Sequence, residues 1–89
     1  MNVYKKHLDV THLQEIKLPI TKIENDIVRV GVSDGKPCLW FLNKPCKAKN
    51  VVIHSYMTGE EIPEDNKLRY LGSYNLDMNT LIHLFAENL

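Results

Sequence analysis

The chain has 89 residues, 44% of them hydrophobic and 25% charged, which is typical of a folded globular domain and excludes a disordered tail. Eleven basic and eleven acidic side chains cancel, so we expect no binding of long nucleic acid, which requires a basic surface. A core of this size is only marginally stable alone, so we expect one domain over residues 1–89 that works as a homo-oligomer.

Two strands are expected before the centre of the chain. Residues 4–10 contain many β-forming side chains and two lysines, a combination typical of an edge strand because lysine discourages unwanted pairing. Their inward-facing side chains should be Tyr4, Leu8 and Val10. Residues 13–18 alternate polar and apolar side chains up to a proline and predict a second strand. Residues 20–26 then cross to the centre of the chain.

The centre of the chain predicts a tight hairpin. Two apolar runs are joined by Asp34-Gly35, and a two-residue type I′ turn needs the positive φ angles that these residues tolerate. The register then runs from Ser33 opposite Lys36 to Val28 opposite Phe41. Because side chains alternate across a strand, the face expected in the core consists of Val28, Val30, Val32, Leu39 and Phe41.

The other face of this hairpin is the candidate binding surface. It should carry Ile27, Arg29, Gly31, Cys38, Trp40 and Leu42. Arg29 would lie across from Trp40, within reach of a cation–π contact, and Gly31 would leave the diagonal position empty. Such a face suits a nucleobase and its phosphate, but a second core layer or a subunit interface would explain the same pattern.

Three further strands and one loop are expected in the second half of the chain. Residues 49–57 predict a strand, residues 60–66 an acidic surface loop, and residues 68–76 a strand with Leu68, Tyr70, Gly72, Tyr74 and Leu76 inside. Residues 80–86 fit a strand or a helix, and the strand is favoured because its length matches residues 68–76. The sum is an all-β fold, a small sandwich or bent antiparallel sheet of about seven short strands.

The sequence carries no pattern typical of an enzyme, a metal site or a cofactor site. Its four histidines lack ligand spacing, and neither a phosphate-binding loop nor a nucleophile motif occurs. Four lysines and no acidic residue lie between residues 35 and 59, so a local patch including Lys36 could bind one small anion, or be ordinary solvated surface. No segment resembles a signal peptide or a membrane span, so we expect a cytoplasmic protein without membrane contact.

Several spaced motifs resemble a group of short phage and prophage proteins. They are DGKPCLW at 34–40, TGEEIP at 58–63, LRYLGSYNLD at 68–77 and LIHLF at 81–85. The shared pattern also includes Tyr4, where many members carry Trp, and it ends in His83 and Phe85. Glu60 stands where many members have His.

The group in turn is similar to phage anti-CBASS sponge proteins, small tetramers that sequester a cyclic dinucleotide such as 3′3′-cGAMP without turnover. The resemblance implies immune evasion in the cytoplasm of an infected bacterial host, with a ligand site shared between subunits. The contacts it suggests are stacking by Trp40 or a tyrosine such as Tyr4, phosphate binding by Arg29 and Lys36, and base reading around Thr58, Gly59 and Ser73. His83 is either a ligand contact or a hydrogen-bonded core residue.

A different function remains open at this point. The Trp40 face would equally serve a protein that blocks a host defence enzyme, or a small structural or regulatory protein of a phage.

Overall fold

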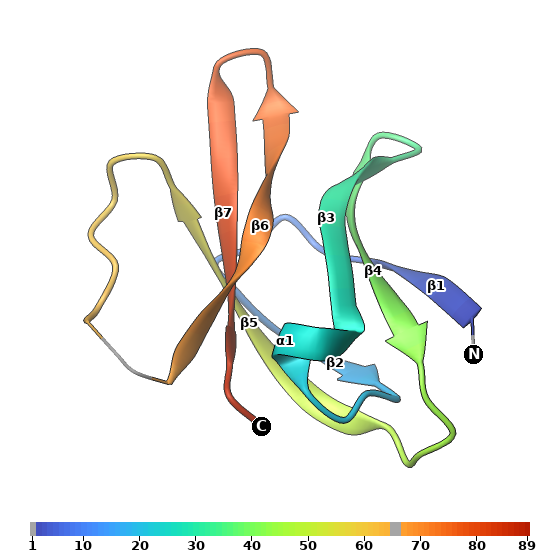
Figure 1. The fold of residues 1–89 in the computed structure, drawn as a ribbon. Helices are drawn as coiled ribbons and strands as arrows, with labels where there is room; N and C mark the ends of the chain where they lie inside the picture. Colours follow the sequence, from blue (N-terminus) through green and yellow to red (C-terminus); the bar gives the residue numbers. More distant parts are fainter. Residues whose placement is uncertain (1, 65–66) are drawn as a thin grey trace.

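The computed structural model describes residues 2–64 and 67–89, and these residues form seven strands and one short helix (Figure 1). In chain order the elements are β1 Asn2–His7, β2 Leu13–Leu18, α1 Ile23–Asp26, β3 Ile27–Ser33, β4 Lys36–Asn43, β5 Lys49–Met57, β6 Leu68–Asp77 and β7 Thr80–Glu87. The all-β prediction is confirmed. Within the described ranges, no helix has the length and apolar character needed to cross a membrane.

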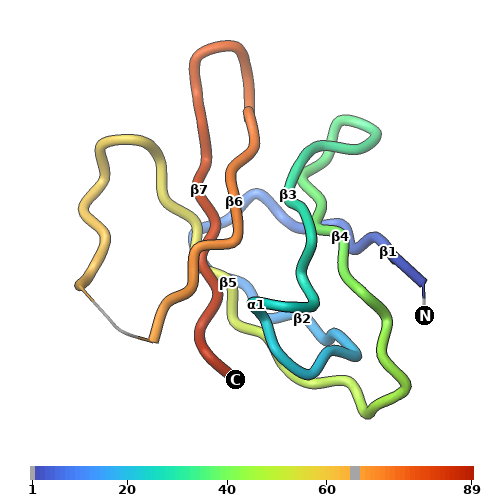
Figure 2. The backbone as a smooth tube through the Cα atoms, viewed as in Figure 1, coloured from blue at the N-terminus to red at the C-terminus, as the bar shows by residue number. Residues whose placement is uncertain are grey.

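The strands form two antiparallel sheets, with the orders β1-β4-β3 and β2-β5-β7-β6. The chain passes from one sheet to the other after β1, after β2 and after β4, so both sheets depend on long-range pairing. Figure 2 shows β3 running beside β6, which is where the two sheets meet. Their inner faces share one core made of Leu8, Ile16, Leu18, Ile20, Ile23, Leu39, Phe41, Val51, Ile53, Tyr74, Ile82, Leu84 and Ala86.

The predicted central hairpin is present. Asp34 and Gly35 have φ angles of 54° and 74°, as a type I′ turn requires, and the predicted pairs from Ser33–Lys36 to Arg29–Trp40 are all formed. The prediction fails at the start of β3, where a bulge pairs Ile27 instead of Val28 with Phe41. Ile27 therefore packs against the core, whereas Val28 is 50% exposed.

Other expected core positions also differ from the structure. Val32 is half exposed because it lies near the hairpin tip, beyond the core. In β6 a register shift between Tyr70 and Gly72 reverses the expected alternation. Leu71 packs against the core, and Leu68 and Tyr70 share the outer face with their partners Glu87 and Phe85. Leu76 is also half exposed, next to a second register shift near the tip of the β6–β7 hairpin.

The remaining boundaries are close to those expected. β1 spans Asn2–His7, so the observed strand begins and ends earlier than the predicted strand at 4–10. Val10 is exposed in the connection to β2. The ambiguous segment 80–86 is strand β7. The crossing 20–26 contains the four-residue helix α1, which was not predicted. The predicted acidic loop 60–66 lies partly outside the described residues.

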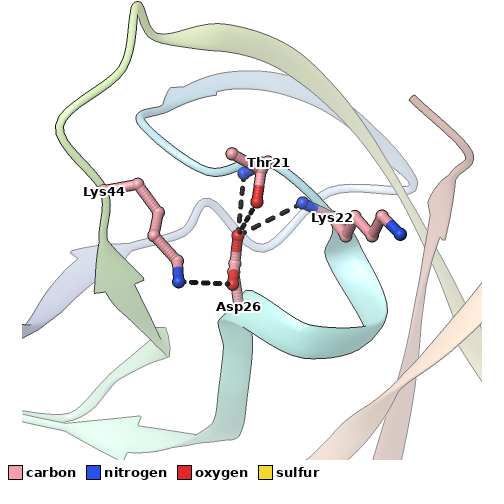
Figure 3. A network of polar contacts seen from close by, with 4 residues as sticks. All are labelled: Thr21, Lys22, Asp26 and Lys44. Atoms are coloured by element: carbon pink, nitrogen blue, oxygen red, sulfur yellow. Dashed lines mark hydrogen bonds and ion pairs between the residues drawn. The ribbon is translucent and has the colours of Figure 1, made fainter.

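A buried carboxylate holds this crossing in place (Figure 3). Asp26 Oδ2 accepts hydrogen bonds from the backbone N–H of Thr21 at 2.7 Å, its hydroxyl at 2.9 Å and the backbone N–H of Lys22 at 3.2 Å. Its Oδ1 lies 3.6 Å from Lys44 Nζ. Because Asp26 directly precedes β3 and Lys44 directly follows β4, the network joins the start of one strand to the end of its neighbour.

These contacts also set the charge state of Asp26. Burial alone raises the pKa of the carboxyl group, but the hydrogen bonds from Thr21 and Lys22 and the positive charge of Lys44 outweigh burial and hold the pKa below its ordinary value of 3.8. The carboxylate is therefore ionised at neutral pH. Its contacts hold the start of β3 to the end of β4.

We expect Asp26→Asn to lower the free energy of unfolding by about 1–3 kcal/mol at neutral pH, since the Thr21 and Lys22 donors lose a charged acceptor. The pKa of Asp26 is depressed in the folded state, so its stabilisation is present above the unfolded pKa and disappears as the pH falls through the folded pKa. Urea denaturation should therefore show a difference in unfolding free energy between the variant and the wild type that is larger at neutral pH than near pH 3. The exposed Asp9→Asn is the matched control, and a gap that does not change with pH would contradict this role of Asp26.

A second prediction concerns the contact between the sheets. Gly72 has a φ angle of 147°, and a Cβ atom there would lie 3.1 Å from Val30 Cβ across the sheet interface. We expect Gly72→Ala to cost about 1–3 kcal/mol of unfolding free energy, as overpacking in a core does. Gly31→Ala is the comparison, since its Cβ would meet the indole of Trp40 at an ordinary 3.4 Å. Equal stability of Gly72→Ala and the wild type in urea would refute this reading.

Candidate functional site

A row of three side chains crosses the outer face of the three-stranded sheet. Lys5 of β1 pairs with Trp40 of β4, and Trp40 pairs with Arg29 of β3 on its other side. The guanidinium carbon of Arg29 lies 5.4 Å from the indole ring centroid, which is a cation–π contact. The predicted pair of Arg29 and Trp40 is thus formed, with a second cation beside it.

The position next to Gly31 was expected to be empty, but it is filled. A Cβ atom on Gly31 would lie 3.4 Å from the Trp40 ring and 3.6 Å from Arg29 Nε, so the indole itself occupies the space above the glycine. The missing side chain lets Trp40 lie close to the sheet with Arg29 against it. A ligand could still contact the exposed guanidinium of Arg29, which lies over the indole ring of Trp40.

The electrostatics of this outer face favour an anion. By register the face carries Val3, Lys5, His7, Arg29, Gly31, Ser33, Lys36, Cys38, Trp40 and Leu42, and none of these described residues is acidic. Lys5 Nζ donates a hydrogen bond to Ser33 Oγ at 2.9 Å, reaching across β4, and Lys36 pairs with Ser33 at the hairpin turn. We call these ten residues the Arg29–Trp40 face.

Cys38 and Tyr4 do not add a functional group to this face. Cys38 belongs to it by register, but its thiol is free and fully buried. Tyr4 pairs with Phe41 on the other side of the same sheet, with ring centroids 6.3 Å apart. Tyr4 and Trp40 therefore do not stack on one ligand within one chain.

The other predicted site residues gather on the outer face of the four-stranded sheet. His83 Nε2 and Thr58 Oγ1 are hydrogen-bonded at 2.9 Å, while His83 Nδ1 is 3.5 Å from the Tyr70 hydroxyl. Ser73 pairs with His83 from the neighbouring strand. Gly59 lies at the end of β5 with a φ angle of 95°, in the turn where the Glu60 N–H donates to the Met57 carbonyl at 3.1 Å.

An aromatic cluster surrounds His83 on this face, and we call it the His83 cluster. Phe85 is the centre of the cluster, with ring centroids 5.8 Å from Tyr56 and 5.2 Å from Tyr70. His54 stacks on Tyr56 and its Nε2 is 2.7 Å from Glu87 Oε2. His83 is thus a hydrogen-bonded residue on the outer face of the sheet, half-buried among aromatic rings.

The two groups of predicted site residues lie on opposite sides of the molecule. The Arg29–Trp40 face is the outer face of the three-stranded sheet, and the His83 cluster lies on the outer face of the four-stranded sheet, while the inner faces of both sheets share the core. A pocket that uses both groups would therefore need two chains. In the part of the chain that the structure describes, no three His, Cys, Asp or Glu side chains are grouped to hold a metal ion.

The sequence pattern did not indicate two features of these sites. Lys5 was expected only as an edge-strand residue, because its place beside Trp40 depends on the pairing of β1 with β4, more than thirty positions away along the chain. Tyr70 was expected in the core, and the register shift in β6 moves it into the His83 cluster. The lysines of the predicted edge strand were the sequence feature that could have pointed to Lys5 as a cation of the site.

Comparisons with known proteins give the family of the chain. A search of curated proteins and a search of solved structures both found no significant match. One family model matches residues 1–89 and therefore covers the chain from end to end. The chain belongs to the family described as domain of unknown function DUF7352.

Proposed function

We propose that the protein binds and sequesters a cyclic dinucleotide of the 3′3′-cGAMP type, without turnover. The observation that carries the proposal is the row in which Lys5 and Arg29 flank Trp40 on a face without acidic residues. A nucleotide presents flat rings and anionic phosphates, and it is recognised by aromatic side chains together with cations. Residues 34–40 resemble a group of short phage and prophage proteins. That group is in turn similar to the sponge proteins, which supports the same ligand.

Arg29 is the proposed phosphate contact. Its guanidinium lies over the indole of Trp40, and stacking of this kind leaves the N–H groups at the edge of the guanidinium available to an anion. Arg29 is exposed, so binding a phosphate does not require a core side chain to move. Lys5, on the far side of Trp40, and Lys36, at the hairpin turn, add positive charge to the same face.

The proposed complex joins two or more chains. A cyclic dinucleotide has two bases and two phosphates, so two copies of the Arg29–Trp40 face can bind it around a two-fold axis, and a tetramer would hold two such sites. Thr58, Ser73 and His83 belong to the opposite face, and in this arrangement they contact the ligand only from a neighbouring subunit. The proposed location is the cytoplasm of an infected bacterial host.

Isothermal titration with 3′3′-cGAMP tests the proposal. We expect saturable heat with the wild type, and an affinity lowered about tenfold or more by Arg29→Gln, since a charge-assisted hydrogen bond contributes about 1.5–3 kcal/mol. Arg69→Gln is the matched control, because Arg69 is also exposed but lies in β6 and bonds to Asn88. Chromatography of the mixture after incubation should return the nucleotide intact.

Two outcomes would contradict the proposal. Heat from none of a panel of cyclic dinucleotides would favour a protein partner for the Trp40 face instead. Equal weakening by Arg29→Gln and Arg69→Gln would show that binding depends on general charge and not on this face.

A further inference from the structure

A cavity of about 360 Å³ lies at one end of the space between the sheets. Its walls come from the β1–β2 connection, the end of β5, and the β6–β7 hairpin, and they include Val10, Ser55, Met57, Tyr74, Leu76 and Ile82. By register, Met57 and Tyr74 both pair with Ile82 on the inner face of the four-stranded sheet. The cavity is thus an extension of the core that the three-stranded sheet does not fill.

Two buried residues that carry hydroxyl groups line this cavity. Tyr74 and Ser55 are only 5% and 8% exposed, and among the described residues neither side-chain hydroxyl forms a hydrogen bond. No fully enclosed side-chain polar atom lacks a partner in the described chain, so each of these two hydroxyls keeps some exposure to solvent. Burial raises the pKa of the Tyr74 hydroxyl above 10.0, so it is a hydrogen-bond donor at neutral pH.

The mouth of the cavity combines apolar side chains with Thr11, His12 and the acidic Glu60. Val10, Met57 and Leu76 are each about half exposed there, and covering such side chains is favourable. Glu60 is fixed at the same rim, with its Oε1 accepting a hydrogen bond from the Met57 N–H at 2.8 Å. Its negative charge disfavours an anionic ligand.

We propose that this cavity binds a small, uncharged, mainly apolar molecule with one hydrogen-bonding group, which Tyr74 and Ser55 receive. The volume is within the range of about 300–1,000 Å³ for small-molecule sites, which combine apolar walls with a few polar groups. The cavity shares no residue with the Arg29–Trp40 face. The inference therefore does not depend on nucleotide binding.

The test uses N-phenyl-1-naphthylamine, an uncharged probe whose fluorescence rises in apolar surroundings. We expect saturable binding at one site per chain, and displacement of the probe by hexan-1-ol. Tyr74→Phe should weaken hexan-1-ol binding about two- to tenfold, the net effect of one hydrogen bond, and should weaken binding of the probe less. Tyr70→Phe is the matched control, because its hydroxyl lies on the outer face near His83.

Charge discrimination gives an independent readout. Hexanoate should displace the probe more weakly than hexan-1-ol does. Glu60→Gln, which can keep the bond to Met57, should raise the affinity for hexanoate by up to about fivefold at low salt. Probe fluorescence that does not saturate, or hexan-1-ol binding that is unchanged by Tyr74→Phe in a folded variant, would overturn the proposal. Both outcomes are independent of any result with 3′3′-cGAMP.

Discussion

The buried carboxylate of Asp26 is the interaction on which the arrangement depends. It lies where the chain passes from the four-stranded to the three-stranded sheet, and it binds Thr21 and Lys22 on one side and Lys44 on the other. Because Lys44 follows β4, the contact fixes the base of the β3–β4 hairpin. The turn at Asp34 and Gly35 fixes the other end of the hairpin, so the register that places Arg29 across from Trp40 is determined at both ends.

Two sheets that share one core leave two outer faces with different chemistry. The Arg29–Trp40 face is cationic around one indole, whereas the His83 cluster is aromatic and includes the contact of His54 with the acidic Glu87. The sheets meet closely where Gly72 approaches Val30 and remain apart at the cavity lined by Tyr74. The same packing of β6 thus explains both the tight contact and the internal space.

The sequence predicts this fold best where the determining interactions are local. The Asp34-Gly35 turn sets its own register, and Arg29 and Trp40 belong to that hairpin, so their contact could be predicted. The bulge at Val28 and the register shift beside Leu71 depend on which strands pack across the core, and no local pattern carries that information. The helix α1 has only four residues and no periodicity to detect. The separation of Trp40 from His83 likewise follows from the assignment of strands to sheets.

The central claim is that a phosphate-bearing nucleotide binds against the Arg29–Trp40 pair. Trp40 is the only tryptophan of the chain, so its fluorescence reports directly on this contact. We predict that 3′3′-cGAMP quenches or shifts the Trp40 emission in a saturable way, while inorganic phosphate at the same concentration does so only weakly. Binding of the nucleotide with no change in Trp40 emission would place the ligand elsewhere and contradict the account.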